Sequence, residues 1–167
     1  VKPYAIPHDW RRCLNIDYGL DMLAALWIAQ SPDGHSVVYR ELYRPGLIIS
    51  DAAAQMLACE TAGERIDCRL APPDLWNRRQ ETGRSAVELF ADSGLDFVKS
   101  SNERVAGWLA LHELLMPRKD TDGAVRPRLT IFDTCHNLIR TLPALQHDKR
   151  NPSDTANTPH ELTHAPD

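Results

Sequence analysis

The stretch CLNIDYGLDMLAALWIAQSPDGHSVVYRELY (residues 13–43) decides the fold. Its opening, Cys13–Tyr18, predicts a strand that enters a turn at Gly19, and Met22–Gln30 predicts a second strand. The turn formers Ser31-Pro32-Asp33-Gly34 then precede a third predicted strand over Ser36–Tyr43. Because short turns connect neighbouring strands in opposite directions, the stretch predicts a three-stranded antiparallel meander.

Helices and strands alternate after this meander. Apolar residues at helical spacing predict a helix over Ile48–Ala62, and Ile66–Ala71 resembles a buried strand. Short helices are predicted over Ser85–Ser93 and, despite Pro143, Asn137–Leu145. The last predicted strand is Leu129–Phe132.

A longer helix is predicted over Asn102–Leu115. The apolar residues that this pattern turns inward are Val105, Trp108, Leu109, Leu111 and Leu115. The full order βββαβααβα predicts an α/β fold with a mixed five-stranded sheet, an antiparallel meander followed by parallel strands, flanked by helices.

Composition limits the class of protein. With 167 residues, 43% of them hydrophobic, the chain is long enough for one compact domain with its own core. Four scattered cysteines without a C-x-x-C pair favour a reducing, cytosolic setting. The longest apolar stretch, Met22–Ala29, falls far short of the roughly 20 residues that a membrane-spanning helix needs. The net charge of −4 argues mildly against a nucleic-acid partner, although clustered metal-binding carboxylates would give the same sign.

The last residues, 159–167, permit two chemistries. His160-Glu161-Leu162-Thr163-His164 fits the H-E-x-x-H pattern of a zinc protease, in which two histidines on one helix hold zinc. Pro159 and Pro166 disfavour a continuous helix through both histidines. If the helix begins near His164 instead, His164 and Asp167 share one face and can approach a divalent metal.

Two carboxylates at predicted strand ends are candidates for that metal site. Asp17 ends the first strand in a largely apolar run, where a buried carboxylate is costly unless its charge is compensated. Asp74 follows Ala71-Pro72-Pro73 at the exit of the fourth strand. On local grounds each could equally be structural, Asp17 as a turn residue beside Gly19 and Asp74 as a helix cap.

At these points the chain resembles the nuclease domain of tailed-phage terminase large subunits. The similarity covers nearly the whole chain and rests on five motifs in the same order: Ile16-Asp17-Tyr18-Gly19, Tyr39-Arg40-Glu41-Leu42-Tyr43, Ala71-Pro72-Pro73-Asp74-Leu75-Trp76-Asn77-Arg78, Asn102-Glu103-Arg104-Val105-Ala106-Gly107-Trp108 and His164-Ala165-Pro166-Asp167. The resemblance implies one ribonuclease H-like domain over residues 1–167. It also implies an endonuclease that cuts concatemeric viral DNA in the host cytoplasm during genome packaging.

The resemblance further implies two Mg²⁺ or Mn²⁺ ions, held by Asp17, Asp74, His164 and Asp167 and hydrolysing the phosphodiester by two-metal chemistry. The partners it implies are double-stranded DNA, the terminase ATPase domain, the small terminase subunit and the portal, with no membrane. No G-x-x-x-x-G-K-[ST] loop occurs, so we expect the motor domain to be absent and ATP not to bind. Family sequences continue into an apolar helix beyond the last aspartate, so we expect that helix to be truncated after Asp167.

Four arginines are candidate phosphate contacts, because guanidinium groups match phosphate oxygens in bidentate geometry. They are Arg78, Arg79, Arg84 and Arg104. Many relatives carry an aspartate directly after the strand-exit alanine, where this chain has Pro72. That difference keeps open a second function, a ribonuclease H-like module that binds DNA or a packaging partner without cutting it.

Overall fold

The predicted meander is present in the computed structural model, which describes residues 1–19, 21–120, 123–146, 148–149, 151 and 153–156. The meander consists of β1 (Arg11–Tyr18), β2 (Leu23–Gln30) and β3 (Ser36–Arg44), paired antiparallel. The Gly19 N–H donates to the carbonyl of Met22 at 2.8 Å and closes the first turn.

Parallel strands extend the meander on both sides. Next to β1 lies β4 (Cys68–Ala71), and next to β3 lies β8 (Leu129–Ile131), both in parallel register. The two-residue strand β5 (Val98–Lys99) pairs with β4, giving the order β5-β4-β1-β2-β3-β8. The predicted mixed sheet is confirmed, with a sixth strand too short to produce a sequence pattern.

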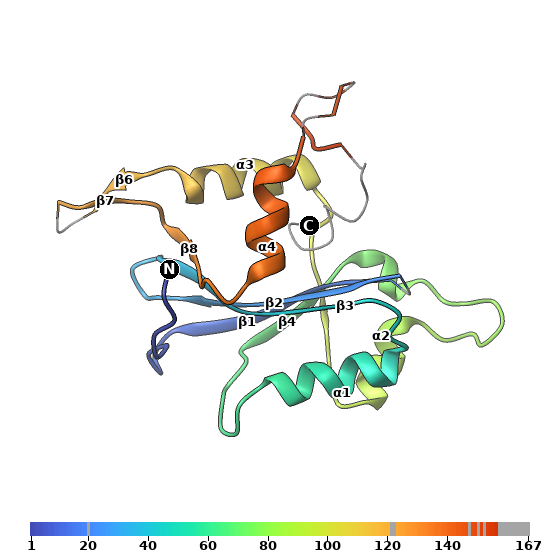
Figure 1. The fold of residues 1–167 in the computed structure, drawn as a ribbon. Helices are drawn as coiled ribbons and strands as arrows, with labels where there is room; N and C mark the ends of the chain where they lie inside the picture. Colours follow the sequence, from blue (N-terminus) through green and yellow to red (C-terminus); the bar gives the residue numbers. More distant parts are fainter. Residues whose placement is uncertain (20, 121–122, 147, 150, 152, 157–167) are drawn as a thin grey trace.

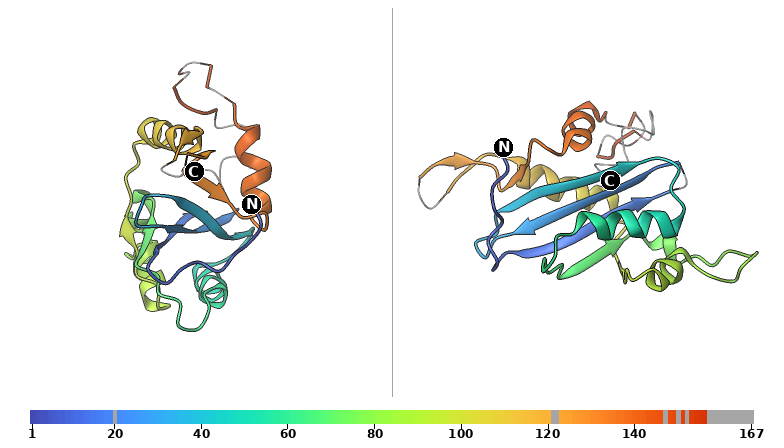
Figure 2. Two further views of the ribbon diagram at one scale, coloured as in Figure 1. Left: turned by 90° about the vertical axis from the view of Figure 1, so that its left-hand side faces the viewer. Right: turned by 60° about the horizontal axis from the view of Figure 1, so that its bottom comes forward.

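Helices cover both faces of this sheet. Two of them, α1 (Ile49–Cys59) and α2 (Ala86–Asp92), lie on one face, and α3 (Arg104–Leu115) and α4 (His136–Thr141) lie on the other (Figure 1). An end-on view separates these layers (Figure 2). The apolar stripe of α1 is buried as its spacing predicts, through Ile49, Ala52, Ala53 and Met56.

The prediction for α3 is wrong in part. None of its residues is fully buried, and Leu109 and Leu115, predicted to face inward, are 63% and 36% exposed. Apolar residues occur on more than one face of this helix, so their spacing did not identify the inner one. Periodicity also missed the hairpin of β6 (Arg118–Lys119) and β7 (Val125–Arg126) that follows α3.

Two short 3₁₀ helices are also present among the described residues. One, η1 (Pro73–Trp76), follows β4, and the other, η2 (Leu142–Ala144), continues from α4. Pro143 lies in η2, so the α-helical part of the predicted segment ends at Thr141.

A carboxylate from the meander holds the start of α4. Glu41 of β3 accepts hydrogen bonds from the backbone N–H groups of Asn137, at 3.0 Å, and Leu138, at 2.7 Å. It also accepts one from the side-chain amide of Asn137 at 2.8 Å. The helix N-cap, Cys135, makes no side-chain capping bond, so Glu41 takes over that role from a different element.

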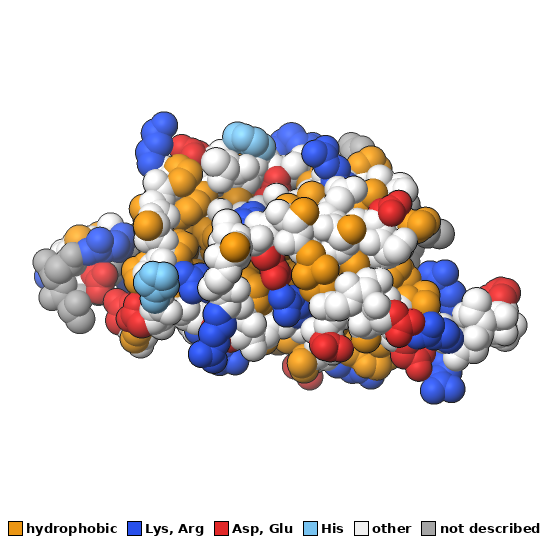
Figure 3. Space-filling view, turned by 90° about the horizontal axis from the view of Figure 1, so that it is seen from below, with side chains coloured by type: hydrophobic (Ala, Val, Ile, Leu, Met, Phe, Trp, Pro, Cys, Tyr) orange, Lys and Arg blue, Asp and Glu red, His pale blue; other side chains and the backbone are white. Residues whose placement is uncertain are grey.

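The core lies mainly between the sheet and the α1–α2 layer. Its largest fully buried side chains include Trp27 of β2 and Phe90 of α2, and the Phe90 ring meets the Tyr18 ring edge-on with centroids 5.3 Å apart. On the outer surface of this layer, acidic and basic side chains are interspersed among hydrophobic ones (Figure 3). Among the described helices, none has the length and apolar character needed to cross a membrane.

Candidate active site

A cleft of about 510 Å³ opens between α3 and the end of β1. Three parts of the chain form its walls: the end of β1, the exit of β4, and the segment that leads into α3. The residues that line it are Asn15, Ile16, Asp17, Leu70, Pro72, Pro73, Ser100, Ser101, Asn102, Glu103, Arg104, Gly107, Trp108 and Leu111. Within α3 these fall at helical spacing, so one face of the helix forms a wall of the cleft.

Strand alternation brings Asp17 to this cleft. Along β1 the buried residues, including Ile16 and Tyr18, alternate with half-buried ones, including Asn15 and Asp17. The second set lies on the sheet face that carries α3. Continuing the parallel β1–β4 register by two residues sets Asp17 beside Pro72.

A second carboxylate reaches the cleft from the segment before α3. After β5, the backbone N–H and the hydroxyl of Ser100 both donate to the carbonyl of Ala71, at 2.9 and 3.0 Å. This anchor holds the Ser100–Arg104 segment against the exit of β4. Of the side chains that line the described part of the cleft, those of Asp17 and Glu103 are the carboxylates.

Sequence reasoning overlooked Glu103. The residue belongs to the Asn102-Glu103-Arg104 motif and directly precedes α3, where an acidic residue is ordinarily explained by the helix dipole. The pairing of β5 with β4, together with the Ser100 hydrogen bonds, brings this motif to the cleft that Asp17 lines. Because that pairing involves two residues, no local pattern reveals it.

Asp74 lies elsewhere. It is exposed, sits in η1, and is not among the residues that line the cleft. Its neighbour Leu75 points into the core and is 6% exposed, which fixes the orientation of this turn. The structure therefore brings Asp17 and Glu103 to one cleft, whereas Asp74 is not among the residues that line it.

The predicted phosphate-binding arginines divide into two groups. Arg104 lines the cleft, where it donates to the hydroxyl of Thr155 at 2.8 Å and pairs with Asp154 at 3.4 Å. The other three lie in or beside the loop between η1 and α2. Arg84 pairs with Asp92 at 2.7 Å.

The remaining two arginines of that loop differ in their surroundings. Arg78 lies 4.0 Å from Glu88, a distant ion pair with an exposed guanidinium. Arg79 lies near Tyr18 at the end of β1. Burial raises the pKa of the Tyr18 hydroxyl, and the positive charge of Arg79 opposes that rise.

The other predicted ligands, His164 and Asp167, lie outside the described residues, as do His160 and Glu161 of the H-E-x-x-H pattern. The described chain ends at Ala156, whose N–H donates to the carbonyl of Gln146 at 2.7 Å. The preceding Thr155 is the residue bound to Arg104, so the described C-terminal segment lies against the cleft. Over the described ranges, no group of three or more His, Cys, Asp or Glu side chains could hold a metal.

The donor atoms in the cleft suit a hard cation. The carboxylates of Asp17 and Glu103 are accompanied by the side-chain amides of Asn15 and Asn102 and by serine hydroxyls. Oxygen donors of this kind are the ligands that Mg²⁺ and Mn²⁺ prefer. The two carboxylates could supply part of the ligands of such an ion.

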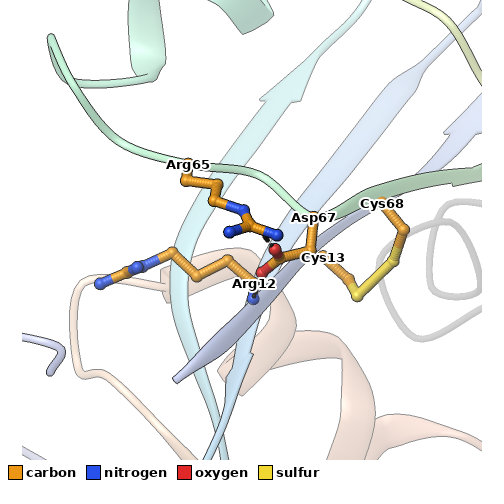
Figure 4. The surroundings of a disulfide bond; sticks show 5 residues. All are labelled: Arg12, Cys13, Arg65, Asp67 and Cys68. Carbon is orange, nitrogen blue, oxygen red and sulfur yellow. Dashed lines mark hydrogen bonds and ion pairs between the residues drawn. A yellow bond between two sulfur atoms is a disulfide. The ribbon is translucent and has the colours of Figure 1, made fainter. Parts of the chain in front are cut away.

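A disulfide lies on the same sheet face as Asp17. Cys13 of β1 and Cys68 of β4 are register partners with Cα atoms 4.8 Å apart, and their sulfur atoms are bonded (Figure 4). The sequence pattern did not predict this bond. The reason is that the partners are 55 residues apart and meet only through the parallel pairing of β1 with β4. Cys59 and Cys135 are free thiols.

Solved structures with the same fold exist, although no family model matches the sequence and no curated protein is significantly similar to it. The nuclease domain of the phage P22 large terminase matches with a TM-score of 0.73 and 16% identity, covering 99% of this chain and 82% of that one. The large terminase nuclease domain of bacteriophage SPP1, with bound Mn, matches with a TM-score of 0.57 and 14% identity, over 93% and 80%.

A third structure agrees with these two. The large terminase nuclease of thermophilic phage G20c, with bound magnesium, matches with a TM-score of 0.51 and 14% identity, covering 90% of this chain and 72% of that one. Each of the three matches covers nine-tenths or more of this chain. The chain therefore has the ribonuclease H-like fold of the large terminase nuclease domains.

Proposed function

We propose that this chain is a nuclease domain that cuts DNA during phage genome packaging and that depends on divalent metal ions. The observation that carries the proposal is the cleft, which brings Asp17 from β1 and Glu103 from the start of α3 together with several other oxygen donors. The fold shared with three terminase nucleases supports it. Two of those relatives hold manganese or magnesium.

The side chains of the cleft would act by holding and orienting. Asp17 and Glu103 would hold Mg²⁺ or Mn²⁺, because carboxylate oxygens are their preferred ligands. When bound, a pair of such ions supplies activation of water and neutralisation of charge on the scissile phosphate. The half-buried position of Asp17 limits its motion and keeps its carboxylate directed into the cleft.

The C-terminal residues complete the proposed ligand set. His164 and Asp167 follow a described segment that Arg104 binds through Asp154 and Thr155 at the edge of the cleft. From Ala156, eight residues of extended chain can span up to about 28 Å, which is enough to return to a neighbouring site. Asp74 stays a proposed ligand, and Glu103 is the alternative to it as the second metal-binding carboxylate beside Asp17.

Variants decide between these acids. Plasmid DNA incubated with the protein and Mn²⁺ should be nicked or linearised, with little sequence preference, and Asp17→Asn should abolish the cleavage. We expect Glu103→Gln to reduce cleavage more than Asp74→Asn, because Glu103 lines the cleft and Asp74 does not. Glu113→Gln, an exposed acid near the other end of α3, is the matched control. Full activity of Asp17→Asn would refute the proposed site.

Binding without cutting is a second candidate function. The described part of the cleft has two carboxylates, Asp17 and Glu103, and no group of three or more metal-ligating side chains occurs among the described residues. A complete site needs more ligands than these two. Calorimetric titration with Mn²⁺ separates the two functions. DNA retained in a mobility-shift assay, without metal binding or cleavage in a C-terminally extended protein, would favour the binding module.

The proposed partners follow from the packaging function. Double-stranded DNA would be the substrate, and the ATPase domain, the small terminase subunit and the portal would be the surrounding assembly. Of the four arginines, Arg79 remains the best candidate for a phosphate contact. The reason is that Arg84 and Arg104 are already bound to acids, whereas Arg79 is exposed beside the end of β1.

A further inference from the structure

We propose that Cys13 and Cys68 form a reversible thiol–disulfide site that controls how rigidly β1 and β4 are held together beside the cleft. Through these two strands the site would set how tightly the cleft binds divalent metal. The effect on metal binding rests on the proposed function, whereas the effect on the two strands rests on the sheet alone.

The disulfide and the cleft share one face of two neighbouring strands. On β1, Cys13, Asn15 and Asp17 occupy alternate positions and so point to the same side. The register pairs Cys13 with Cys68 and Asn15 with Leu70. The disulfide is therefore the first of the β1–β4 pairs on this face, and the next pair on the same face, Asn15 with Leu70, lines the cleft.

The wall formed by β4 is a short strand. The strand has four residues, of which three pair with β1 and two pair with β5. Both residues of β5 are exposed, so the neighbour on that side of β4 adds little burial. Successive residues on one face of a strand are only about 7 Å apart. A covalent link at Cys13 is thus close enough to restrict the separation of β1 and β4 at the cleft.

Noncovalent contacts keep the two cysteines adjacent when the bond opens. The Asp67 N–H donates to the carbonyl of Arg12 at 2.8 Å, and the Arg12 N–H donates to the Asp67 carboxylate at 2.9 Å. Arg65 pairs with the other oxygen of that carboxylate at 2.7 Å (Figure 4). These contacts do not depend on the sulfur atoms. The reduced protein should therefore stay folded and hold its two thiols ready to re-form the bond.

The chemistry needs a thiol or a disulfide as co-reactant. A dithiol such as dithiothreitol breaks the bond between the two sulfur atoms, transfers two electrons and two protons to the cysteines, and becomes a cyclic disulfide. Oxidised glutathione reverses this by exchange: the disulfide forms again and two glutathione thiols are released. Cys13 and Cys68 are both half-buried, so neither residue is enclosed in the core.

The free cysteines provide internal references for the test. The wild-type protein is oxidised with glutathione disulfide, or reduced with dithiothreitol and desalted, and each form is alkylated and analysed by mass spectrometry. Cys13 and Cys68 should be labelled only after reduction. Cys59, half-buried and unpaired, should be labelled in both forms. Cys135 should react slowly in both, because burial raises the pKa of its thiol to about 12.

Two further measurements connect the bond to the cleft. Amide hydrogen exchange should be faster in the reduced protein at β4 and at Ser100, whose N–H binds Ala71. The dissociation constant for Mn²⁺, measured by calorimetry, should rise about fivefold on reduction, the low end of couplings between linked sites, and should recover on reoxidation. The variant Cys13→Ser/Cys68→Ser should behave like the reduced wild type in both reagents, whereas Cys59→Ser should keep the response.

The outcomes separate this inference from the proposed function. Labelling of Cys13 and Cys68 without reduction would overturn it, and so would equal Mn²⁺ affinity in the two forms. If neither form binds Mn²⁺, the proposed metal site is wrong, and hydrogen exchange then decides the inference. Exchange at β4 that does not depend on the bond would overturn it, and exchange that accelerates on reduction would support it.

Discussion

Replacing Glu41 by alanine should destabilise the protein by about 2 kcal/mol, through the start of α4. The substitution removes the acceptor of three hydrogen bonds, two of them from the backbone N–H groups of Asn137 and Leu138. Loss of a helix cap costs about 0.5–2 kcal/mol, and a buried donor left unsatisfied costs about 1–3 kcal/mol. Water can reach half-buried Asn137 and replace part of the lost hydrogen bonding, so the estimated cost lies near the middle of these ranges.

Thermal and urea unfolding measure this cost. For a protein of this size 1 kcal/mol corresponds to roughly 2–4 °C, so Glu41→Ala should lower Tm by about 4–8 °C. Glu41→Gln keeps one carbonyl oxygen in place and should lose about half as much. Hydrogen exchange should become faster at Asn137 and Leu138.

An exposed acid provides the control for this experiment. Glu113 is on α3, with a side chain 72% exposed and 3.9 Å from Arg118, and Glu113→Ala should change stability by less than about 0.5 kcal/mol. If Glu41→Ala and Glu113→Ala have the same Tm, the carboxylate of Glu41 does not hold α4. The reasoning about this helix start would then be wrong.

Three other predictions test the core, the pH dependence and the C-terminal segment. Phe90→Ala, which removes a fully buried ring, should cost about 3–5 kcal/mol in urea unfolding, and a cost below 1 kcal/mol would contradict the packing described for α2. Burial tends to raise the pKa of Glu64, but hydrogen bonds from Thr61, Tyr39 and Arg40 outweigh it and lower that pKa. Unfolding free energy should therefore fall as the pH drops below the usual carboxyl pKa of 4.5, and Tyr39→Phe should weaken this dependence. If the unfolding free energy of Tyr39→Phe falls with pH as steeply as that of the wild type, the Tyr39 hydrogen bond is not a cause of the dependence. Arg104→Ala should accelerate tryptic cleavage after Lys149, since Asp154 and Thr155 lose their partner, whereas Arg118→Ala should not; equal rates would mean that Arg104 does not hold this segment.

Much of the fold could be predicted, because its signals are local. The meander has turn formers between its strands, and α1 carries one continuous apolar stripe that the sheet buries. The parallel pairing of β4 and β8 also follows from a general rule: when a helix lies between two strands of one sheet, the strands usually run parallel. In α3 the same reasoning selected Leu109 and Leu115, which are exposed, because one face of this helix lines a cleft and only part of the helix packs against the core.

The candidate site was predictable only where one residue carried its own signal. Asp17 stands out as a carboxylate at the end of an apolar strand, and it lines the cleft. Glu103 and the Cys13–Cys68 bond depend on which strands lie next to β1 and β4, and neither pairing has a local pattern. Asp74 was selected for its place after β4, but it lies in η1 and is not among the residues that line the cleft.

The strand order also has a consequence for how the chain folds. The pairs β1–β2 and β2–β3 join segments separated by a few residues, so closing them loses little chain entropy and they can form early. In contrast, β4 reaches β1 across 55 residues, and the pairing of β8 with β3 joins Leu129 to Ser36, which lie still further apart in the sequence. Contacts between distant segments slow folding. We expect the meander to form first as a nucleus, and the cleft, whose walls come from both kinds of segment, to be assembled in the last step.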